Sequence, residues 1–148
     1  MCEVGPDDWA DWRLVRLRSL TENPEAFASS VTMWTGERDI EPNWRERLSL
    51  PGACFLAYDG ATPVGMAAAQ PGVDGVELIS MWVAAEARRR GIGRELVDAV
   101  LVWADDRPVR LRVIDGNESA IRVYESGGFV LHPGGADAEG CRAMTRPV

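Results

Sequence analysis

The sequence predicts a mixed α/β domain in which a central, mostly antiparallel sheet carries helices on both faces. The 148 residues are 46% hydrophobic and 26% charged, which is the size and balance of one globular domain. In the middle third, apolar runs separated by Asp59-Gly60 and Asp74-Gly75 are typical of antiparallel hairpins. Further on, a helical pattern lies between two strand patterns, and such a crossover is right-handed and joins parallel strands. We therefore expect a single domain over residues 1–148.

The N-terminal third predicts a short strand followed by two helices. "CEVG" is a very short strand, and residues 6–20 form a helix that opens with a proline and two aspartates, which suit a helix N-terminus. A second helix is expected over residues 37–50, where Ile40, Trp44 and Leu48 lie four residues apart on one face. The brevity of the first strand leaves a sheet edge that a second copy could complete. A monomer and a homodimer are both compatible with this pattern.

The middle third predicts an antiparallel meander of three strands. The expected strands cover residues 53–58, 64–70 and 76–83. The third run is apolar at almost every position, as expected for a central strand covered on both faces.

The remaining elements alternate between helix and strand. A helix is expected over residues 91–105, a strand at "VRLRVI" (109–114), and a helix at "NESAIRVYESGG" (117–128). "FVLH" and "CRAMTRPV" are the expected last two strands, joined by a glycine-rich loop. The predicted order is therefore β, α, α, β, β, β, α, β, α, β, β.

The composition of the chain argues against several classes of function. No apolar run is long enough to span a membrane, and the N-terminus lacks a secretory pattern. Cys2, Cys54 and Cys141 are widely spaced and His132 has no partner pattern, which predicts reduced thiols in a cytoplasmic protein and no metal site. The net charge of −7 argues against nucleic-acid binding and is compatible with a cationic small-molecule substrate.

An arginine- and glycine-rich turn, residues 88–94, joins the predicted central strand to a helix. Free N–H groups at a helix N-terminus bind anions, and glycines let a phosphate approach the backbone. The dinucleotide fingerprint does not fit, because Leu96 stands where its third small residue belongs. The P-loop does not fit either, because the chain contains no lysine. A solvated basic turn that meets an acidic patch is the alternative interpretation.

The hexapeptide Arg88-Arg89-Arg90-Gly91-Ile92-Gly93 matches Gln/Arg-x-x-Gly-x-Gly/Ala, the acetyl-coenzyme A signature of the GNAT N-acetyltransferase superfamily. Three further stretches resemble that family in the same order. They are "NPEAFASS", similar to the substrate-side region of bacterial members, "ELISMWV", and N-x-x-A-x-x-x-Y-x-x-x-G-F, carried by Asn117, Ala120, Tyr124, Gly128 and Phe129. The resemblance covers nearly the whole chain. One departure is Ala84-Ala85 in place of a frequent proline, which we expect to loosen the turn.

The resemblance implies a GNAT-like sheet in which the parallel strands 76–83 and 109–114 part from each other. It implies transfer of an acetyl group from acetyl-CoA to a primary amine by direct attack, without a metal. The strand around Met81, Trp82 and Val83 would pair with the pantetheine arm at a bulge. The backbone amides of residues 89–94 would bind the pyrophosphate, and arginine side chains would add contacts to the 3′-phosphate. The implied coenzyme residues of this turn are Arg88, Arg89, Arg90, Gly91, Ile92, Gly93 and Arg94.

Catalytic roles also follow from the resemblance. Tyr124 matches the position that protonates the departing thiolate, and a helix tyrosine packed on the sheet is the alternative to this favoured role. Asn117 can cap its helix, bind the pantetheine arm, or do both. Glu77 is the implied general base, with a strand-end glutamate and a water chain as alternatives. A bulge would decide whether residues 77, 79, 81 and 83 share a face, and strand alternation leaves open which helix layer Trp82 faces.

The acceptor side is the least determined part of the sequence. Phe27, Ser29, Ser30 and Trp34 lie in the region that resembles the acceptor wall, and each could instead belong to the core. The acceptor is expected to be a small-molecule amine or a protein N-terminus. The alternative functions are a non-catalytic acyl-CoA-binding regulatory module and an interaction domain.

Overall fold

The computed structural model describes residues 1–23 and 36–147. Within these residues seven strands form one sheet in the order β1-β2-β3-β4-β5-β7-β6. All neighbouring strands are antiparallel except β4 and β5, which are parallel, so the predicted mixed sheet is confirmed. The strands are β1 (Cys2–Val4), β2 (Ala53–Asp59), β3 (Thr62–Pro71), β4 (Val76–Val83), β5 (Val109–Ile114), β6 (Val130–Leu131) and β7 (Cys141–Arg146).

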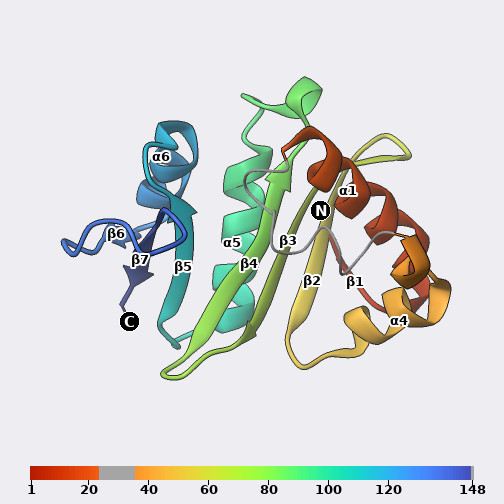
Figure 1. Ribbon diagram of the computed structural model, residues 1–148, viewed down its shortest axis with the longest axis horizontal. Helices are drawn as coiled ribbons and strands as arrows, with labels where there is room; N and C mark the ends of the chain where they lie inside the picture. Colours follow the sequence, from red (N-terminus) through yellow and green to blue (C-terminus); the bar gives the residue numbers. More distant parts are fainter. Residues whose placement is uncertain (24–35, 148) are drawn as a thin grey trace.

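Helices cover both faces of the sheet, as predicted. Figure 1 shows α1 and α4 over the β1–β3 half on one face, and α5 on the other face. The helices are α1 (Trp9–Glu22), α4 (Glu41–Ser49), α5 (Ile92–Ala104) and α6 (Glu118–Ser126), with 3₁₀ turns η1 (Pro6–Asp8), η3 (Gly36–Arg38) and η4 (Ala85–Ala87). The second predicted helix begins later than expected. Ile40 is extended and 49% exposed, whereas Trp44 and Leu48 are buried.

Each helix layer packs on its own hydrophobic cluster. Leu96, Val97 and Val100 of α5 are fully buried against the alanine-rich strand β3. The fit is close, because a Cβ added at Gly65 would lie 3.1 Å from Leu96 Cδ1. Trp12 and Trp44 anchor the cluster between the sheet and α1 and α4.

A β-bulge in β4 decides which side chains face which layer. Met66 of β3 pairs with Trp82, but Ala68 pairs with Ile79, so one β3 residue opposes two of β4. Ser80 takes a positive φ of 55° at this point. The in-and-out alternation therefore shifts by one residue. Ile79 and Trp82 both join the α1/α4 cluster, whereas Met81 packs on the α5/α6 cluster. Alternation alone would have placed residues 79 and 82 on opposite faces.

The parallel pair separates soon after it begins. Strands β4 and β5 are paired only at Val76–Val109 and Glu77–Arg110. From Leu78 to Val83, β4 has no strand neighbour on its β5 side. The two halves of the sheet diverge beyond this point (Figure 1), and the site described below lies there. None of the helices over residues 1–23 and 36–147 is long and apolar enough to cross a membrane.

Candidate active site

Two cavities meet where β4 and β5 diverge. The helix-end cavity, of about 1070 Å³, lies between β4, the N-terminus of α5, and α6. The sheet-face cavity, of about 620 Å³, lies between β4, β5, α1 and α4. Both are bordered by Met81, Ile114, Asn117, Ala120 and Tyr124. A group bound in one cavity can therefore reach a group bound in the other beside Tyr124.

The helix-end cavity gathers every predicted coenzyme residue except Arg90. Gly91 precedes α5 with a φ of +78°, a conformation that glycine adopts without strain. The first backbone hydrogen bond of α5 runs from the Glu95 N–H to the Gly91 carbonyl. Over the described chain, the N–H groups of residues 89–94 have no hydrogen-bond acceptor. Unpaired donors at the positive end of a helix dipole form a site for an anion.

The arginine side chains of this turn have different environments. Arg90 Nη1 lies 3.1 Å from Asp59 Oδ2 at the β2–β3 turn, which accounts for its absence from the cavity lining. Arg94 pairs with Asp98 at 2.9 Å along α5. Arg89 lines the cavity with no carboxylate partner among the residues described, and so does Arg122 of α6, which sequence reasoning missed. No local pattern distinguishes Arg122 from any other exposed helical arginine.

Asn23, at the end of α1, is a second residue that the sequence did not reveal. Its Oδ1 accepts a hydrogen bond from Trp82 Nε1 at 2.8 Å and another from Arg88 Nη2 at 3.3 Å. Arg88 Nε also donates to the Val83 carbonyl at 3.0 Å. This cluster fixes the side chains at the end of β4 beside the cavity.

The turn after β4 is well anchored despite its alanines. Ala84 donates its N–H to the Val64 carbonyl at 2.8 Å, and Ala84 and Ala87 are both buried. Arg18 of α1 contacts Glu86 at 2.8 Å, and this guanidinium lowers the pKa of Glu86 to about 2. The predicted loosening of the turn is therefore not observed.

Tyr124 is 7% exposed and packs edge-on against Phe129, with ring centroids 5.9 Å apart. Burial raises the pKa of the Tyr124 hydroxyl well above its ordinary value, so the phenol stays protonated at neutral pH. The hydroxyl makes no hydrogen bond to any described residue, and the side chain borders both cavities. The Tyr124 hydroxyl thus lies at the junction of the two cavities and donates its proton to no described residue.

Asn117 acts as the N-cap of α6. Its Oδ1 accepts a hydrogen bond from the Ala120 N–H at 3.4 Å. This cap uses the amide oxygen and not the NH₂ group, which can donate to a ligand. The residue borders both cavities, so the cap places it at the junction.

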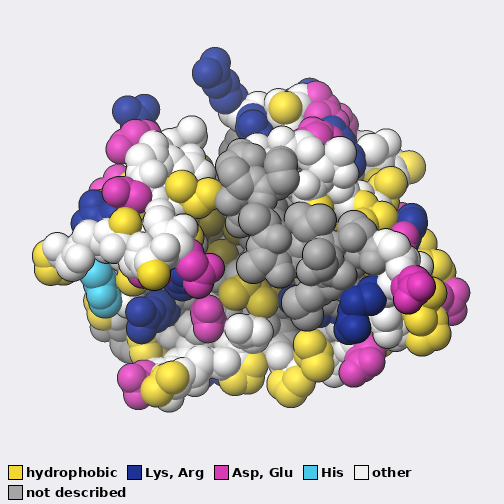
Figure 2. All heavy atoms as spheres, in the orientation of Figure 1, with side chains coloured by type: hydrophobic (Ala, Val, Ile, Leu, Met, Phe, Trp, Pro, Cys, Tyr) yellow, Lys and Arg dark blue, Asp and Glu magenta, His cyan; other side chains and the backbone are white. Residues whose placement is uncertain are grey.

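The sheet-face cavity carries an uneven set of charges. Its arginines come from α1, η3, α4 and β5 (Arg16, Arg38, Arg47 and Arg112), whereas its carboxylates are Glu46 and Glu77. Glu77 is half-buried beside Arg110 of β5. On the face in Figure 2, acidic side chains are interspersed with basic ones and form no single acidic patch. This lining does not favour the cationic acceptor that net charge suggested.

The predicted acceptor residues Phe27, Ser29, Ser30 and Trp34 lie outside the described residues. The arginines of the sheet-face cavity escaped prediction because they come from four separate elements and share no sequence pattern. Across the described ranges, no group of three or more His, Cys, Asp or Glu side chains is placed to hold a metal ion. His132 contacts Thr145 Oγ1 at 3.0 Å and lines neither cavity.

Residues 18–129 match the model of the acetyltransferase (GNAT) family, and the chain belongs to this family. Mycothiol acetyltransferase from Thermobispora bispora is 34% identical over 137 residues, covering 86% of this chain and 44% of that protein. N-acetyltransferase 8 from Homo sapiens is 32% identical over 120 residues, covering 74% of this chain and 52% of that protein. The chain thus spans about half the length of these curated relatives. The solved structure of yncA from Salmonella typhimurium with its cofactor acetyl-CoA has the same fold, with a TM-score of 0.72, 16% identity, and coverage of 97% of this chain and 90% of that one.

Proposed function

We propose that this chain transfers an acetyl group from acetyl-CoA to a primary amine by direct attack of the amine nitrogen on the thioester carbon. The unpaired N–H groups of residues 89–94 carry the proposal, because they present a preformed anion site in the cavity that Tyr124 shares with the acceptor side. Family membership and a fold neighbour solved with acetyl-CoA support it.

The helix-end cavity fits a coenzyme with a diphosphate and an extended arm. Its volume of about 1070 Å³ suits a ligand larger than an ordinary metabolite. The amides of residues 89–94 would hold the diphosphate, with Arg88, Arg89, Arg94 and Arg122 around it. The unpaired edge of β4 at Met81, Trp82 and Val83 would pair with the pantetheine amides like an added strand. The bound coenzyme supplies the thioester carbon and the thiolate leaving group.

The reaction forms an N–C bond and breaks a C–S bond. The acceptor ammonium first loses a proton, which makes its nitrogen a nucleophile. As the C–S bond breaks, Tyr124 donates its phenolic proton to the sulfur, and the proton released from the acetylated nitrogen leaves through the base or solvent. Holding both reactants at the cavity junction lowers the entropic part of the barrier.

Glu77 is the proposed base. It borders the sheet-face cavity on the same face of β4 as Ile79. No described ion pair holds its carboxylate, so it remains available to the acceptor nitrogen directly or through water. Phe27, Ser29, Ser30 and Trp34 remain the proposed acceptor wall.

A direct test is calorimetry with acetyl-CoA, followed by mass detection of acetylated amines. Saturation at about 100 times the dissociation constant should stabilise the protein by about 2.7 kcal/mol. Failure to bind acetyl-CoA would overturn the proposal. Binding without acetylation of any amine in a broad panel would instead indicate the non-catalytic acyl-CoA-binding alternative, which the placement of Tyr124 at the junction disfavours.

A further inference from the structure

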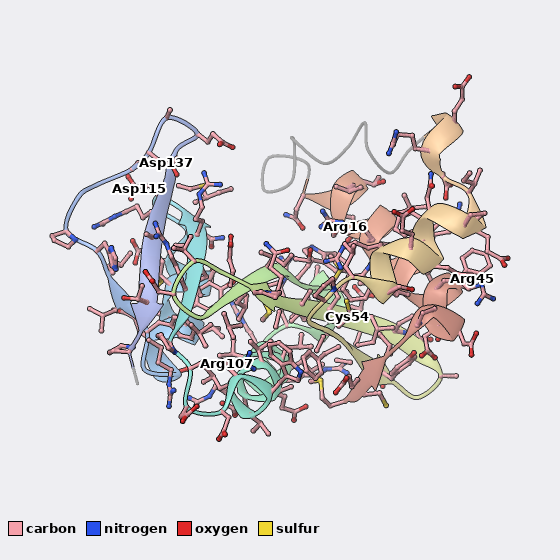
Figure 3. The ribbon with its side chains drawn as sticks, turned by 90° about the horizontal axis from the view of Figure 1, so that it is seen from below. Arg16, Arg45, Cys54, Arg107, Asp115 and Asp137 are labelled. Atoms are coloured by element: carbon pink, nitrogen blue, oxygen red, sulfur yellow. The ribbon has the colours of Figure 1, made fainter. Side chains whose placement is uncertain are left out.

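The C-terminal end of α1 reaches the helix-end cavity. Asn23 follows α1 and lines this cavity together with Trp82 and Arg88. Every other described residue of the lining belongs to β4 or to a later part of the chain. In Figure 3, where Arg16 marks α1 and Asp115 marks the loop after β5, these two elements lie on opposite sides of the diverging strands. Asn23 is therefore the one described contribution of the N-terminal helices to the cavity proposed for the coenzyme.

One oxygen atom of Asn23 accepts hydrogen bonds from two side chains. Its Oδ1 lies 2.8 Å from Trp82 Nε1 and 3.3 Å from Arg88 Nη2. Trp82 is 6% exposed, and within the described chain Asn23 is the only acceptor for its indole N–H. The guanidinium carbon of Arg18 also lies 5.5 Å from the centroid of the Trp82 ring. Because a buried donor is costly to leave unpaired, this bond fixes the Asn23 oxygen beside Arg88.

Arg88 is oriented by neutral oxygens and keeps its charge. Its Nε donates to the Val83 carbonyl at 3.0 Å, and its Nη2 donates to Asn23. No ion pair in the described part of the chain includes Arg88. The carboxylate of Glu86 makes its short contacts with Arg18, at 2.8 and 3.0 Å, and attracts Arg88 only over a longer distance. The Arg88 guanidinium therefore remains available to an anion in the cavity that it lines.

The Val83 carbonyl faces the open edge of β4. The next N–H, that of Ala84, donates to the Val64 carbonyl of β3 at 2.8 Å. In a trans peptide unit the C=O and the N–H point in opposite directions, so the Val83 carbonyl points away from β3, toward the side without a strand neighbour. A carbonyl oxygen has two lone pairs, so Val83 can accept from Arg88 and from a pantetheine amide together. Arg88 thus lies along the edge proposed for the arm, at the start of the turn proposed for the diphosphate.

We propose that Asn23 is a positioning residue for the coenzyme, which holds Arg88 in the orientation that receives the phosphates. This inference rests on the proposed function for the identity of the ligand. A freely rotating arginine loses rotamer freedom when a ligand immobilises it, and this loss weakens binding. Asn23 and the Val83 carbonyl restrict the side chain before the ligand arrives. The end of α1 therefore contributes to coenzyme affinity, although the sequence motif that predicts coenzyme binding covers residues 88–93 alone.

The test is a double-mutant cycle in which affinity for coenzyme A is measured by calorimetry. Asn23→Ala should weaken binding about fivefold, because the ligand itself then has to order Arg88. Arg88→Met should weaken binding about tenfold, because the charged contact is lost. In the double variant the affinity should equal that of Arg88→Met within about twofold, since Asn23 acts through Arg88. A purely structural role for Asn23 would instead give independent losses that multiply.

Tyr58→Phe is the matched control. It also removes a hydrogen bond of 2.8 Å between the sheet and α1, from the Tyr58 hydroxyl to Asp11, but Tyr58 lines neither cavity. Its melting temperature should fall, like that of Asn23→Ala, while its affinity for coenzyme A stays within about twofold of wild type. The same cycle in a Trp82→Phe background leaves no indole N–H without an acceptor, so it can be measured even where Asn23→Ala alone unfolds.

Two outcomes separate this inference from the proposed function. Wild-type affinity in Asn23→Ala, or losses that multiply in the double variant, overturns the inference and leaves the proposed function standing. Absence of coenzyme A binding by the wild-type protein overturns the proposed function and this inference with it.

Discussion

At the residue scale, Tyr124 is the proposed acid, and its side chain is buried at the junction of the two cavities. Burial raises the pKa of the Tyr124 hydroxyl further above neutral, so the phenol carries the proton that the proposed acid would donate. Phe129 packs against its ring and fixes its position without using its hydroxyl. The same residue type at position 58 has a different environment, because the Tyr58 hydroxyl donates to Asp11 at 2.8 Å in the other layer.

Replacing Tyr124 by phenylalanine should lower kcat by about 10²-fold or more, because the departing thiolate loses its proton donor. The ring contact with Phe129 survives, so coenzyme affinity should change less than about twofold. Steady-state kinetics and calorimetry measure these two quantities. Tyr58→Phe is the control, since it loses about 1 kcal/mol of stability with its hydrogen bond and should keep full turnover. Retained activity in Tyr124→Phe would remove it as the acid.

Replacing Glu77 by glutamine should depress the rate at neutral pH and move the rising limb of the pH–rate profile to higher pH. The physical reason is that deprotonation of the acceptor then relies on bulk base rather than on a positioned carboxylate. Glu46→Gln, which alters the other carboxylate of the sheet-face cavity, should leave the limb in place. An unchanged profile in Glu77→Gln would assign the proton to a water chain.

At the element scale, the join between β4 and α5 creates the site. A bulge at Ser80 turns Trp82 toward Asn23 and Met81 toward α5, and η4 then leads the chain to the helix N-terminus. Because Gly91 takes a positive φ, the preceding amides remain unpaired and α5 can begin abruptly. The proposed anion site therefore depends on backbone conformation more than on arginine side chains.

The variant Gly91→Ala should weaken coenzyme A binding and lower the free energy of unfolding by about 1–2 kcal/mol, because alanine is strained at this φ. Apart from its own chain neighbours, no atom of the residues described lies within 4 Å of a Cβ built there, so backbone strain rather than a clash with them is the cause. Gly135→Ala is the matched control, since it has a φ of +74° with the same open surroundings in the β6–β7 loop. Both variants should lose stability in chemical denaturation, but only Gly91→Ala should lose affinity in calorimetry. Equal affinity in the two variants would contradict the role of this turn.

At the scale of the whole molecule, the sheet separates two hydrophobic layers, and each layer contributes different residues to the two cavities. The α5/α6 layer carries the proposed anion site and the proposed acid, and the α1/α4 layer contributes arginines of the sheet-face cavity. The position of α4 against α1 therefore matters for the acceptor side. Asp39 ties these helices together, accepting from Arg13 Nε at 2.7 Å and Nη2 at 2.6 Å and from Trp44 Nε1 at 2.7 Å.

Replacing Asp39 by asparagine should lower the free energy of unfolding at pH 7 by about 1–3 kcal/mol, because charge-assisted bonds to two partners are lost. Hydrogen bonds from Arg13 hold the pKa of Asp39 below its ordinary value. The stabilisation is therefore fully present above the unfolded pKa of about 4, and it is lost as the pH falls through the lower folded value. Denaturation across pH 2–7 should show the gap between wild type and variant closing at the acidic end. Asp7→Asn, whose carboxylate is 98% exposed, should show almost no gap at any pH.

The sequence by itself determined the order of elements, the hairpins at Asp-Gly turns, the parallel crossover and the position of the turn between β4 and α5. These follow from local periodicity, turn chemistry and helix starts, which need only neighbouring residues. It also placed Tyr124 and Asn117 at one site through the spacing of a single helix.

Only the tertiary structure decided which charges share a cavity. The sheet-face cavity brings together Arg16 of α1, Arg47 of α4 and Glu77 of β4. Their spacing in the sequence does not predict that they share a cavity. One extra residue in β4 decides which helix layer Trp82 faces. The ion pair with Asp59 directs Arg90 away from the helix-end cavity. Each outcome is set by contacts between residues distant in the chain, where packing geometry rather than local preference selects the partner.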